Sequence, residues 1–452
     1  MQAPPNPPRQ SGKKTPPSQQ VIRKRMILFF LQVFSVMMLL TLVTFSFILI
    51  SRSFGGDSVP VVTTVPTTIA PTDPPIPATP TPSPSPSLVP APEEYLPDSP
   101  KAEAYFGPLP VAETPEPVRN FEVRGIYIGN GASMSDKIEA FKDSEVNTFV
   151  LDLKEADGVY FDCTNELANS LGVVRNAFKT ADMVKKAHDA GFKLVGRIVC
   201  FKDPKLATAH PDRSIKDAAG NTLKFTNEEN YAFANPYDTR NWDYYIDLAL
   251  EAVAAGVDEI QFDYVRFPTG KTSTGEKPYF GDPEAVPSRI EVINRFLQTA
   301  RVRIQDEHGV PVTADVFGII IASKIDATNL GQEWGTLGLT GISAVSPMIY
   351  PSHYALNTVI NGVKFEKPDH RPHDLIYNAL MSGKTAASVE HYSVVRPYLQ
   401  AFTAKYIGAG NWIEYTYKEI NDQIKATYAA GYKEWVLWNS GGKYPEGKYD
   451  GK

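Results

Sequence analysis

The chain has 452 residues, 42% of them hydrophobic, and a formal net charge of −6 at pH 7. This acidic balance argues against a surface that binds a polyanion, so nucleic acid is excluded as the expected partner. The two cysteines, Cys163 and Cys200, form no CxxC or Cys/His pattern typical of zinc, so we expect neither a metal nor a cofactor.

The N-terminus combines a basic tail with a long apolar segment. Residues 1–25 hold six basic residues and no acidic one, and residues 26–50 hold no charged residue. An apolar span of roughly 20 residues crosses a bilayer as a helix, and the basic excess favours a cytoplasmic N-terminus. We therefore expect a cytoplasmic tail (1–25), a transmembrane signal-anchor helix (26–50) and an extracytoplasmic remainder. A cleaved signal peptide is the alternative, but its apolar region would be only about 7–15 residues long.

Residues 51–119 are rich in Pro, Thr and Ser, most densely at 80–86. Proline fixes φ and removes a donor, so this composition predicts a disordered, largely extended linker. Such a spacer suits reach through a cell wall, although a flexible tether without further purpose fits the same residues.

Residues 120–452 alternate apolar strand patterns with helical ones. Strands are expected over 123–129, 148–155, 193–201, 259–267, 312–318, 344–350, 395–402 and 434–439. The clearest helical patterns cover 135–146, 180–190, 242–255, 285–305 and 417–430. Eight strands alternating with helices predict an α/β (β/α)8 TIM barrel. An open doubly wound sheet is the runner-up, but Gly129-Asn-Gly131 is too short for its dinucleotide fingerprint.

The fourth expected strand carries the most informative residues. Along 258–268, Gln261 and Asp263 alternate with Ile260, Phe262 and Tyr264, so the two polar side chains share a face. In a TIM barrel the chemistry lies at the C-terminal ends of the strands. The other polar candidates at those ends are Asp152, Lys154, Arg197, Asp203, Arg266 and Asp315.

Asp263 and Asp315 are expected on neighbouring strands at similar depth. Paired carboxylates are what glycoside hydrolysis requires, one as a proton donor and one as a nucleophile or base. Adjacent strands suit a separation of about 5–5.5 Å, the retaining geometry. Arg197 and Lys154 would keep one carboxylate ionised, while Asp152 and Asp203 compete with Asp315 as the partner of Asp263. A purely structural ion-pair network is the alternative.

Aromatic residues at the strand ends favour a sugar substrate, because their faces offer a large apolar area to a pyranose. Among them we expect Tyr350 and Trp438 to wall the substrate site. Cys163 and Cys200 lie close enough in the predicted fold to pair in an oxidising compartment, but two buried free thiols fit better.

Several ordered motifs resemble a bacterial family of unknown function described as a "putative glycoside hydrolase domain". They are Arg124-Gly-Ile-Tyr127, Leu151-Asp-Leu-Lys154, Arg197-Ile-Val-Cys-Phe-Lys-Asp203, Asn235-Pro-Tyr237 and residues 258–268. The resemblance implies a TIM barrel distantly similar to α-amylase-like glycosidases. In those relatives an Asp closing strand four is the nucleophile, which corresponds to Asp263, whereas the acid on strand five is a Glu and this chain has Asp315.

The sequence thus predicts a membrane-anchored, extracytoplasmic glycoside hydrolase acting on a cell-wall or environmental polysaccharide, with Asp263 as nucleophile and Asp315 as acid/base. A catalytically inactive carbohydrate-binding wall protein on the same barrel is the alternative. A metal-dependent polysaccharide deacetylase is a third hypothesis, for which the sequence offers no ligand pattern.

Overall fold

The computed structural model describes residues 90–92 and 97–452. The expected tail (1–25), the expected transmembrane helix (26–50) and most of the expected linker lie outside the described residues. Within the described part of the chain, no helix is both long and apolar enough to span a bilayer.

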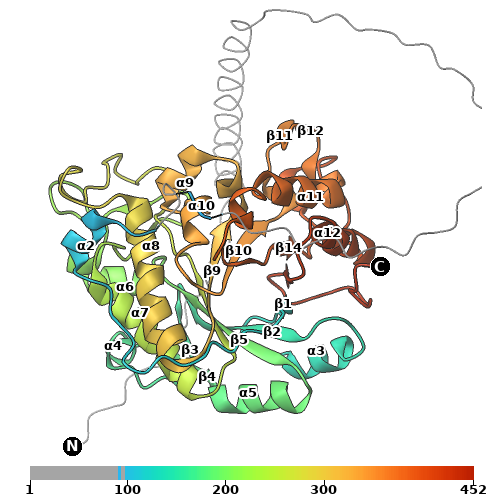
Figure 1. The fold of residues 1–452 in the computed structure, drawn as a ribbon, viewed down its shortest axis with the longest axis horizontal. Helices are drawn as coiled ribbons and strands as arrows, with labels where there is room; N and C mark the ends of the chain where they lie inside the picture. The colour runs from blue at the N-terminus through green and yellow to red at the C-terminus, as the bar shows by residue number, and fades with distance from the viewer. Residues whose placement is uncertain (1–89, 93–96) are drawn as a thin grey trace, which may run out of the picture. The chain divides into compact units, whose positions relative to one another are not determined.

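Eight parallel strands form a closed barrel (Figure 1). Their order is β1 (Arg124–Tyr127), β2 (Thr148–Glu155), β5 (Lys193–Val199), β8 (Glu259–Asp263), β9 (Val312–Phe317), β10 (Ala344–Ile349), β14 (Tyr398–Gln400) and β15 (Trp435–Trp438). The barrel closes because β1 pairs in parallel with both β2 and β15. Closure confirms the (β/α)8 prediction and rules out the open doubly wound sheet.

Helices lie outside the strands, with α7 and α8 on one side and α11 and α12 on the other (Figure 1). They are α2 (Pro100–Phe106), α3 (Met134–Phe141), α4 (Glu166–Ser170), α5 (Thr180–Asp189), α6 (Pro204–Ala209), α7 (Thr239–Ala254), α8 (Arg289–Ala300), α9 (Lys324–Leu330), α10 (Trp334–Leu337), α11 (Pro372–Ser382) and α12 (Tyr417–Ala429). A π-helical turn, Arg301–Asp306, continues α8. The five helices expected from the sequence are all present.

All eight expected strands are confirmed, but two end earlier or break for local reasons. The seventh is split into β13 (Val394–Val395) and β14 because Pro397 between them has no N–H for the ladder. The fourth ends at Asp263 rather than near Phe267, because Tyr264 adopts a left-handed conformation with φ 53°. The chain therefore turns directly after Asp263.

Smaller strands decorate the barrel. β3 (Gly158–Phe161) pairs antiparallel with the end of β2 and in parallel with β4 (Val174–Phe178). Two hairpins stand in the connections after β5 and β10, namely β6 (Lys224–Phe225) with β7 (Tyr231–Ala232), and β11 (Thr358–Ile360) with β12 (Val363–Phe365). These insertions belong to the loops that follow the barrel strands, where a barrel keeps its functional groups.

The last part of the expected linker is ordered and packs on the barrel, which corrects the prediction. Residues 100–106 form α2, and the ring of Phe106 lies 4.7 Å from that of Trp242 on α7. Gln298 on α8 donates to Asp98 at 2.8 Å, and Arg119 donates to the carbonyl of Gly309 at 3.2 Å. These aromatic contacts and hydrogen bonds order a segment whose composition is typical of a linker. The globular region therefore begins near residue 97.

Two groups of buried side chains form the core. The larger group packs between the strands and the helices. The smaller one fills the barrel interior and contains Val123, Tyr127, Val150, Val195, Tyr350, Tyr398 and Val436. Cys163 and Cys200 are both buried and free, so they do not pair.

Candidate active site

A single buried guanidinium gathers four carboxylates in the barrel. Arg197 on β5 contacts Asp263 on β8 through Nη2 at 2.6 Å and Nε at 3.1 Å. Its Nη1 lies 2.6 Å from Asp152 and 2.5 Å from Glu155 on β2. Asp315 on β9 is 3.9 Å from Nε. Burial lowers the pKa of Arg197, but the charges of Asp263, Glu155 and Asp152 raise it above its ordinary value, so Arg197 stays charged.

The parallel register explains why these residues meet. Asp152 is aligned with Arg197, and Val199 at the end of the same strand is aligned with Asp263. Asp315 is aligned with Ser346 of the next strand. Each acid therefore stands near the C-terminal end of its strand, at the position where barrels hold reactive groups.

Asp263 is fully engaged as a carboxylate. One oxygen, Oδ2, accepts both bonds from Arg197, and the other, Oδ1, accepts from the backbone N–H of Tyr264 at 2.6 Å. The left-handed conformation of Tyr264 turns the chain away directly after this bond. A non-glycine residue in this region is strained, and such strain concentrates at functional sites.

Asp315 has the opposite environment. Its side chain is only 2% exposed, and its Oδ1 has no hydrogen-bond partner among the described residues. Burial raises the pKa of Asp315 well above its ordinary value, the charge of Asp263 raises it further, and Arg197 lowers it only in part. Arg197 Nε lies 3.1 Å from Oδ2 of Asp263 and 3.9 Å from Oδ2 of Asp315. These two carboxylate oxygens are therefore at most about 7 Å apart.

Asp152 is the second carboxyl with a raised pKa. Burial raises the pKa of Asp152 to about 6, against the opposing effect of Arg197 and with a further increase from Glu155. The hydroxyl of Tyr127 donates to its Oδ2. A carboxyl that titrates in this range can serve as a general acid or base near neutral pH.

An open cavity of about 450 Å³ reaches part of this cluster. Tyr127, Asp152, Glu155 and Tyr160 line it, together with the turn after β1 and Ser440 to Gly442 after β15. Asp263 and Asp315 are not among its lining residues. The side chain of Glu155 is 29% exposed, whereas that of Asp263 is 7% exposed, so substrate entering here meets the β2 carboxylates first.

Lys154 and Asp203 form a separate ion pair of 3.0 Å, which differs from the expectation that both act on the Asp263 cluster. Lys154 also donates to the carbonyl of Val199 and lies against the ring of Tyr245 on α7. Asp203 caps α6 through the N–H of Leu206. The cause is a register shift in β2 between Asp152 and Lys154, which turns Lys154 toward the helices.

Arg266 is directed to the β6–β7 insertion. Its Nη1 lies 2.9 Å from Glu228 Oε1, and its Nη2 lies 3.3 Å from Glu228 Oε2. Its guanidinium stacks over the rings of Tyr264 and Phe317. Arg266 therefore ties the insertion to the ends of β8 and β9 instead of contacting Asp263.

Tyr350 and Trp438 do lie together, stacked with ring centroids 5.6 Å apart. Tyr350 is almost fully buried, while Trp438 is half-buried and also lies 6.2 Å from Tyr127. Of the two residues expected to wall the site, Trp438 therefore has the more accessible ring.

Sequence reasoning missed Glu155 and Tyr127 as members of the cluster. Tyr127 closes the motif Arg124-Gly-Ile-Tyr127 at the end of β1, and Glu155 directly follows the motif Leu151-Asp-Leu-Lys154 at the end of β2. Among the residues the structure describes, no group of His, Cys, Asp and Glu side chains has the arrangement of a metal site.

Comparisons with known proteins were made for the whole chain. Residues 123–444 match the model of a family described as "Putative glycosyl hydrolase domain". No protein with a curated description matches. The matched segment runs from just before β1 to beyond β15, so it contains the entire barrel and the Arg197 cluster.

Several solved structures are similar to this chain. A hypothetical protein from Ruminiclostridium thermocellum ATCC 27405 is 32% identical over 43% of this chain and 99% of that one, with a TM-score of 0.38. The glycoside hydrolase domain of PgaB (BpsB) from Bordetella bronchiseptica is 11% identical over 72% and 95%, with a TM-score of 0.47. Alpha-L-fucosidase isoenzyme 2 from Paenibacillus thiaminolyticus is 17% identical over 73% and 48%, with a TM-score of 0.42.

Proposed function

The chain belongs to the family described as "Putative glycosyl hydrolase domain", and from this premise we propose that it hydrolyses O-glycosidic bonds of a polysaccharide at the Arg197 cluster. Asp263 acts as the ionised nucleophile and Asp315 as the proton donor and later base. Arg197 fixes the charge and orientation of Asp263, and Asp152 in turn orients Arg197.

The observation that carries this proposal is the unequal hold on two neighbouring carboxyls. Asp263 accepts two bonds from Arg197 and one from a backbone N–H, so both of its oxygens are held in place. Asp315 touches the same guanidinium only at 3.9 Å and has a desolvated, unpartnered oxygen, so its neutral form is favoured. Two neighbouring carboxyls whose hydrogen bonding and burial differ in this way are typical of the acid and the nucleophile of a glycosidase.

The reaction follows from these protonation states. Asp315 donates its proton to the glycosidic oxygen as the bond to the anomeric carbon breaks, and Asp263 forms an ester bond to that carbon. Water deprotonated by Asp315 then hydrolyses the ester. This double displacement retains the anomeric configuration, and it suits carboxylates about 5–5.5 Å apart, a spacing within the bound that Arg197 sets.

Asp152 is the competing proton donor. It lines the open cavity and its pKa is raised to about 6, whereas Asp315 is more deeply buried. In that variant of the mechanism Asp263 keeps its role and Asp315 only tunes its charge.

A catalytically inactive carbohydrate-binding protein is the second candidate function. The low exposure of Asp263 and Asp315, which lie outside the walls of the open cavity, favours it. This candidate predicts glycan binding without turnover.

The cellular setting is part of the proposal and rests on the sequence alone. An uncharged apolar segment over 26–50 with a basic flank favours a single-pass membrane anchor that leaves the barrel outside the cytoplasm. The substrate is then a cell-wall or environmental polysaccharide.

Hydrolysis of labelled wall and storage glycans by the full chain tests the proposal, with NMR of the first released anomer to assign stereochemistry. Release of product with retained configuration supports the double displacement. Binding of a glycan without any release, under conditions where the protein is folded, supports the inactive binding protein instead.

A further inference from the structure

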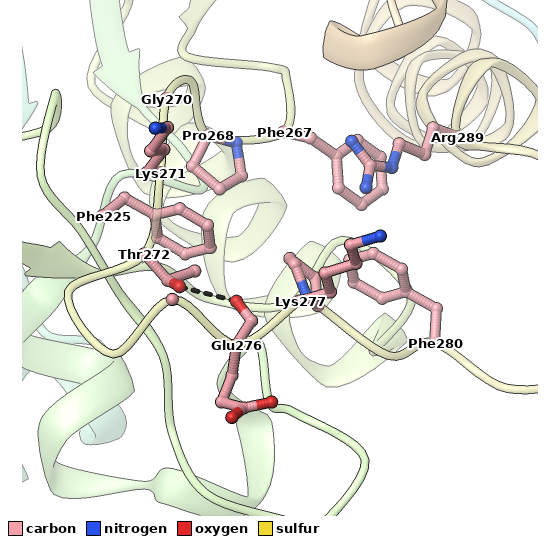
Figure 2. A pocket seen from close by; sticks show the side chains of 12 residues that line it. Phe225, Phe267, Pro268, Gly270, Lys271, Thr272, Glu276, Lys277, Phe280 and Arg289 are labelled. Atoms are coloured by element: carbon pink, nitrogen blue, oxygen red, sulfur yellow. Dashed lines mark hydrogen bonds between the residues drawn. The ribbon is translucent and has the colours of Figure 1, made fainter.

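A second cavity, of about 490 Å³, lies away from the Arg197 cluster. It is formed by the loop that follows β8, by the start of α8 and by Phe225 of the β6–β7 hairpin (Figure 2). Its volume falls within the roughly 300–1,000 Å³ typical of small-ligand pockets. The loop that builds it begins at Tyr264, directly after Asp263, so the cavity and the candidate catalytic site share one connection of the barrel.

Aromatic rings and one guanidinium make up one side of the cavity. Phe267 and Phe280 lie edge to face with centroids 5.3 Å apart. The guanidinium of Arg289 stands over both rings, 5.0 Å from the centroid of Phe267 and 5.3 Å from that of Phe280. Figure 2 shows Arg289 and the ammonium of Lys277 on this same side. The aromatic contacts therefore fix the orientation of a cation at the cavity wall.

Within the described part of the chain, the cations of this cavity have no ionic partner. Arg289 donates from Nη1 to the backbone carbonyl of Asn329 at 2.8 Å, and among the described residues no carboxylate pairs with it, with Lys271 or with Lys277. The one acidic lining residue is Glu276, whose carboxylate points away from the aromatic rings in Figure 2. Its backbone carbonyl instead accepts from the hydroxyl of Thr272 at 2.6 Å.

We propose that this cavity binds a carboxylate-bearing sugar, a uronic acid residue of an acidic polysaccharide. A planar guanidinium pairs with a carboxylate through two parallel hydrogen bonds, which a neutral hydroxyl cannot match. Phe280, which is part-exposed, supplies the apolar face against which a pyranose ring packs, and the buried rings of Phe267 and Phe225 support the wall behind it. As a statement about substrate class, the inference rests on the proposed glycosidase function, but as a statement about binding it stands without turnover.

Burial strengthens the preference for an anion. Desolvation lowers the pKa of Arg289, because a guanidinium held between two rings has lost part of its hydration. An arriving carboxylate restores the missing counter-charge where water screens it less than at an open surface. A neutral glycan would leave this charge uncompensated.

Binding is tested on the full chain with the substitution Asp263→Asn, so that turnover cannot consume the ligand. Titration calorimetry uses oligosaccharides of galacturonate, glucuronate or mannuronate, each with its methyl ester as a neutral match. We expect at least one acid to bind and its ester to bind much more weakly. Lys277→Gln should weaken binding about two- to fivefold, as for an exposed pair, and Arg289→Gln about tenfold or more, as for a charged hydrogen bond.

Controls separate the local effect from net charge and from misfolding. Lys448→Gln removes an exposed charge outside the cavity and should leave the affinity unchanged. Lys277→Glu changes only an exposed side chain, so it should fold normally and still reduce binding more than Lys277→Gln. The proposal is overturned if no acid in the panel binds, if acid and ester bind equally, or if Lys277→Glu behaves as Lys448→Gln does.

Two further outcomes are decisive. If inorganic phosphate displaces the oligosaccharide as well as free galacturonate does, the cavity is an anion site without sugar recognition, and the proposal fails. If acidic oligosaccharides bind as expected but no glycan is cleaved by the unmodified chain, the proposed hydrolysis fails while this binding site stands.

Discussion

Arg197 donates two hydrogen bonds to one carboxylate oxygen of Asp263, from Nη2 at 2.6 Å and from Nε at 3.1 Å. The other oxygen accepts from the N–H of Tyr264, so both oxygens of the carboxylate are fixed. The same guanidinium reaches Asp152 and Glu155 through its remaining terminal nitrogen. One buried cation therefore holds the charge balance of the whole cluster.

Removal of that cation should strongly destabilise the barrel. Arg197→Met removes the cation that contacts Asp152, Glu155 and Asp263 within 2.6 Å, which costs about 3–5 kcal/mol of the free energy of unfolding. The loss should be larger at pH 8 than at pH 5, because protonation relieves the repulsion at the lower pH. Urea melts at both pH values measure it. Arg175→Met, which breaks an exposed 3.4 Å pair with Asp157, is the matched control and should change stability by under about 1 kcal/mol.

The effect of removing the proton donor on the rate should depend on the leaving group of the substrate. Asp315→Asn should lower kcat/KM for the natural glycan about 10²–10⁴-fold, yet leave kcat/KM for a dinitrophenyl glycoside nearly unchanged, because kcat/KM reports the first step and that leaving group departs without a proton. The kcat on the dinitrophenyl glycoside should still fall, because the second step loses its base. Steady-state rates on both substrates measure the contrast. Should Asp152→Asn show this contrast and Asp315→Asn not, then Asp152 is the donor, and the alkaline limb of the wild-type pH profile should lie near pH 6.

The buried carboxyl of Asp315 should also make stability depend on pH. Because its pKa is raised in the folded state, the folded form binds more protons than the unfolded one above the ordinary Asp range. Stability from this group is complete below that range and is lost as pH rises through the folded pKa. Asp315→Asn removes the titration, so its Tm minus that of the wild type should increase from pH 4 to pH 9, by at least about 2 °C.

A Tm difference that is constant over the same range would mean that Asp315 does not titrate on folding. Scanning calorimetry at five pH values provides the measurement. Asp157→Asn, at a 60% exposed side chain, is the surface control.

The ring of Trp438 should contribute to substrate binding. Trp438→Ala removes a half-buried face stacked on Tyr350, and we expect KM to rise about 3- to 10-fold with a smaller effect on kcat. Trp438→Phe keeps an aromatic face and should recover most of the affinity. An unchanged KM in Trp438→Ala would remove this residue from the substrate site.

Most of the fold could be predicted because the barrel strands carry strong local patterns. Apolar runs bounded by glycines located all eight strands and five of the helices between them, but not the shorter helices or α11. The break at Pro397 and the end of β8 at Tyr264 each depend on the backbone of a single residue, which the apolar pattern of a strand does not reveal. The packing of 97–119 was missed because its composition is that of a linker, whereas its order comes from contacts with α7 and α8.

The site was harder to predict because side-chain direction depends on register. Alternation along β2 puts Asp152 and Lys154 on one face and Glu155 on the other. The register shift between Asp152 and Lys154 reverses this, so that Glu155 joins Arg197 and Lys154 pairs with Asp203. A bulge of this kind has no signature in these residues. The pairing of Arg197 with Asp263 needed only the strand order, which the sequence supplied.

The central claim is that Asp263 is the nucleophile, and the rate of glycan hydrolysis by Asp263→Asn tests it most directly. Asn keeps the shape of the side chain but has one oxygen for the donors that Asp263 serves with two, so the Tm should fall. Arg197 keeps Asp152 and Glu155 as partners, so we expect the variant to fold. On a glycan that the wild type cleaves, we predict that kcat falls about 10³-fold or more. Full hydrolytic activity in a folded Asp263→Asn variant would contradict the assignment.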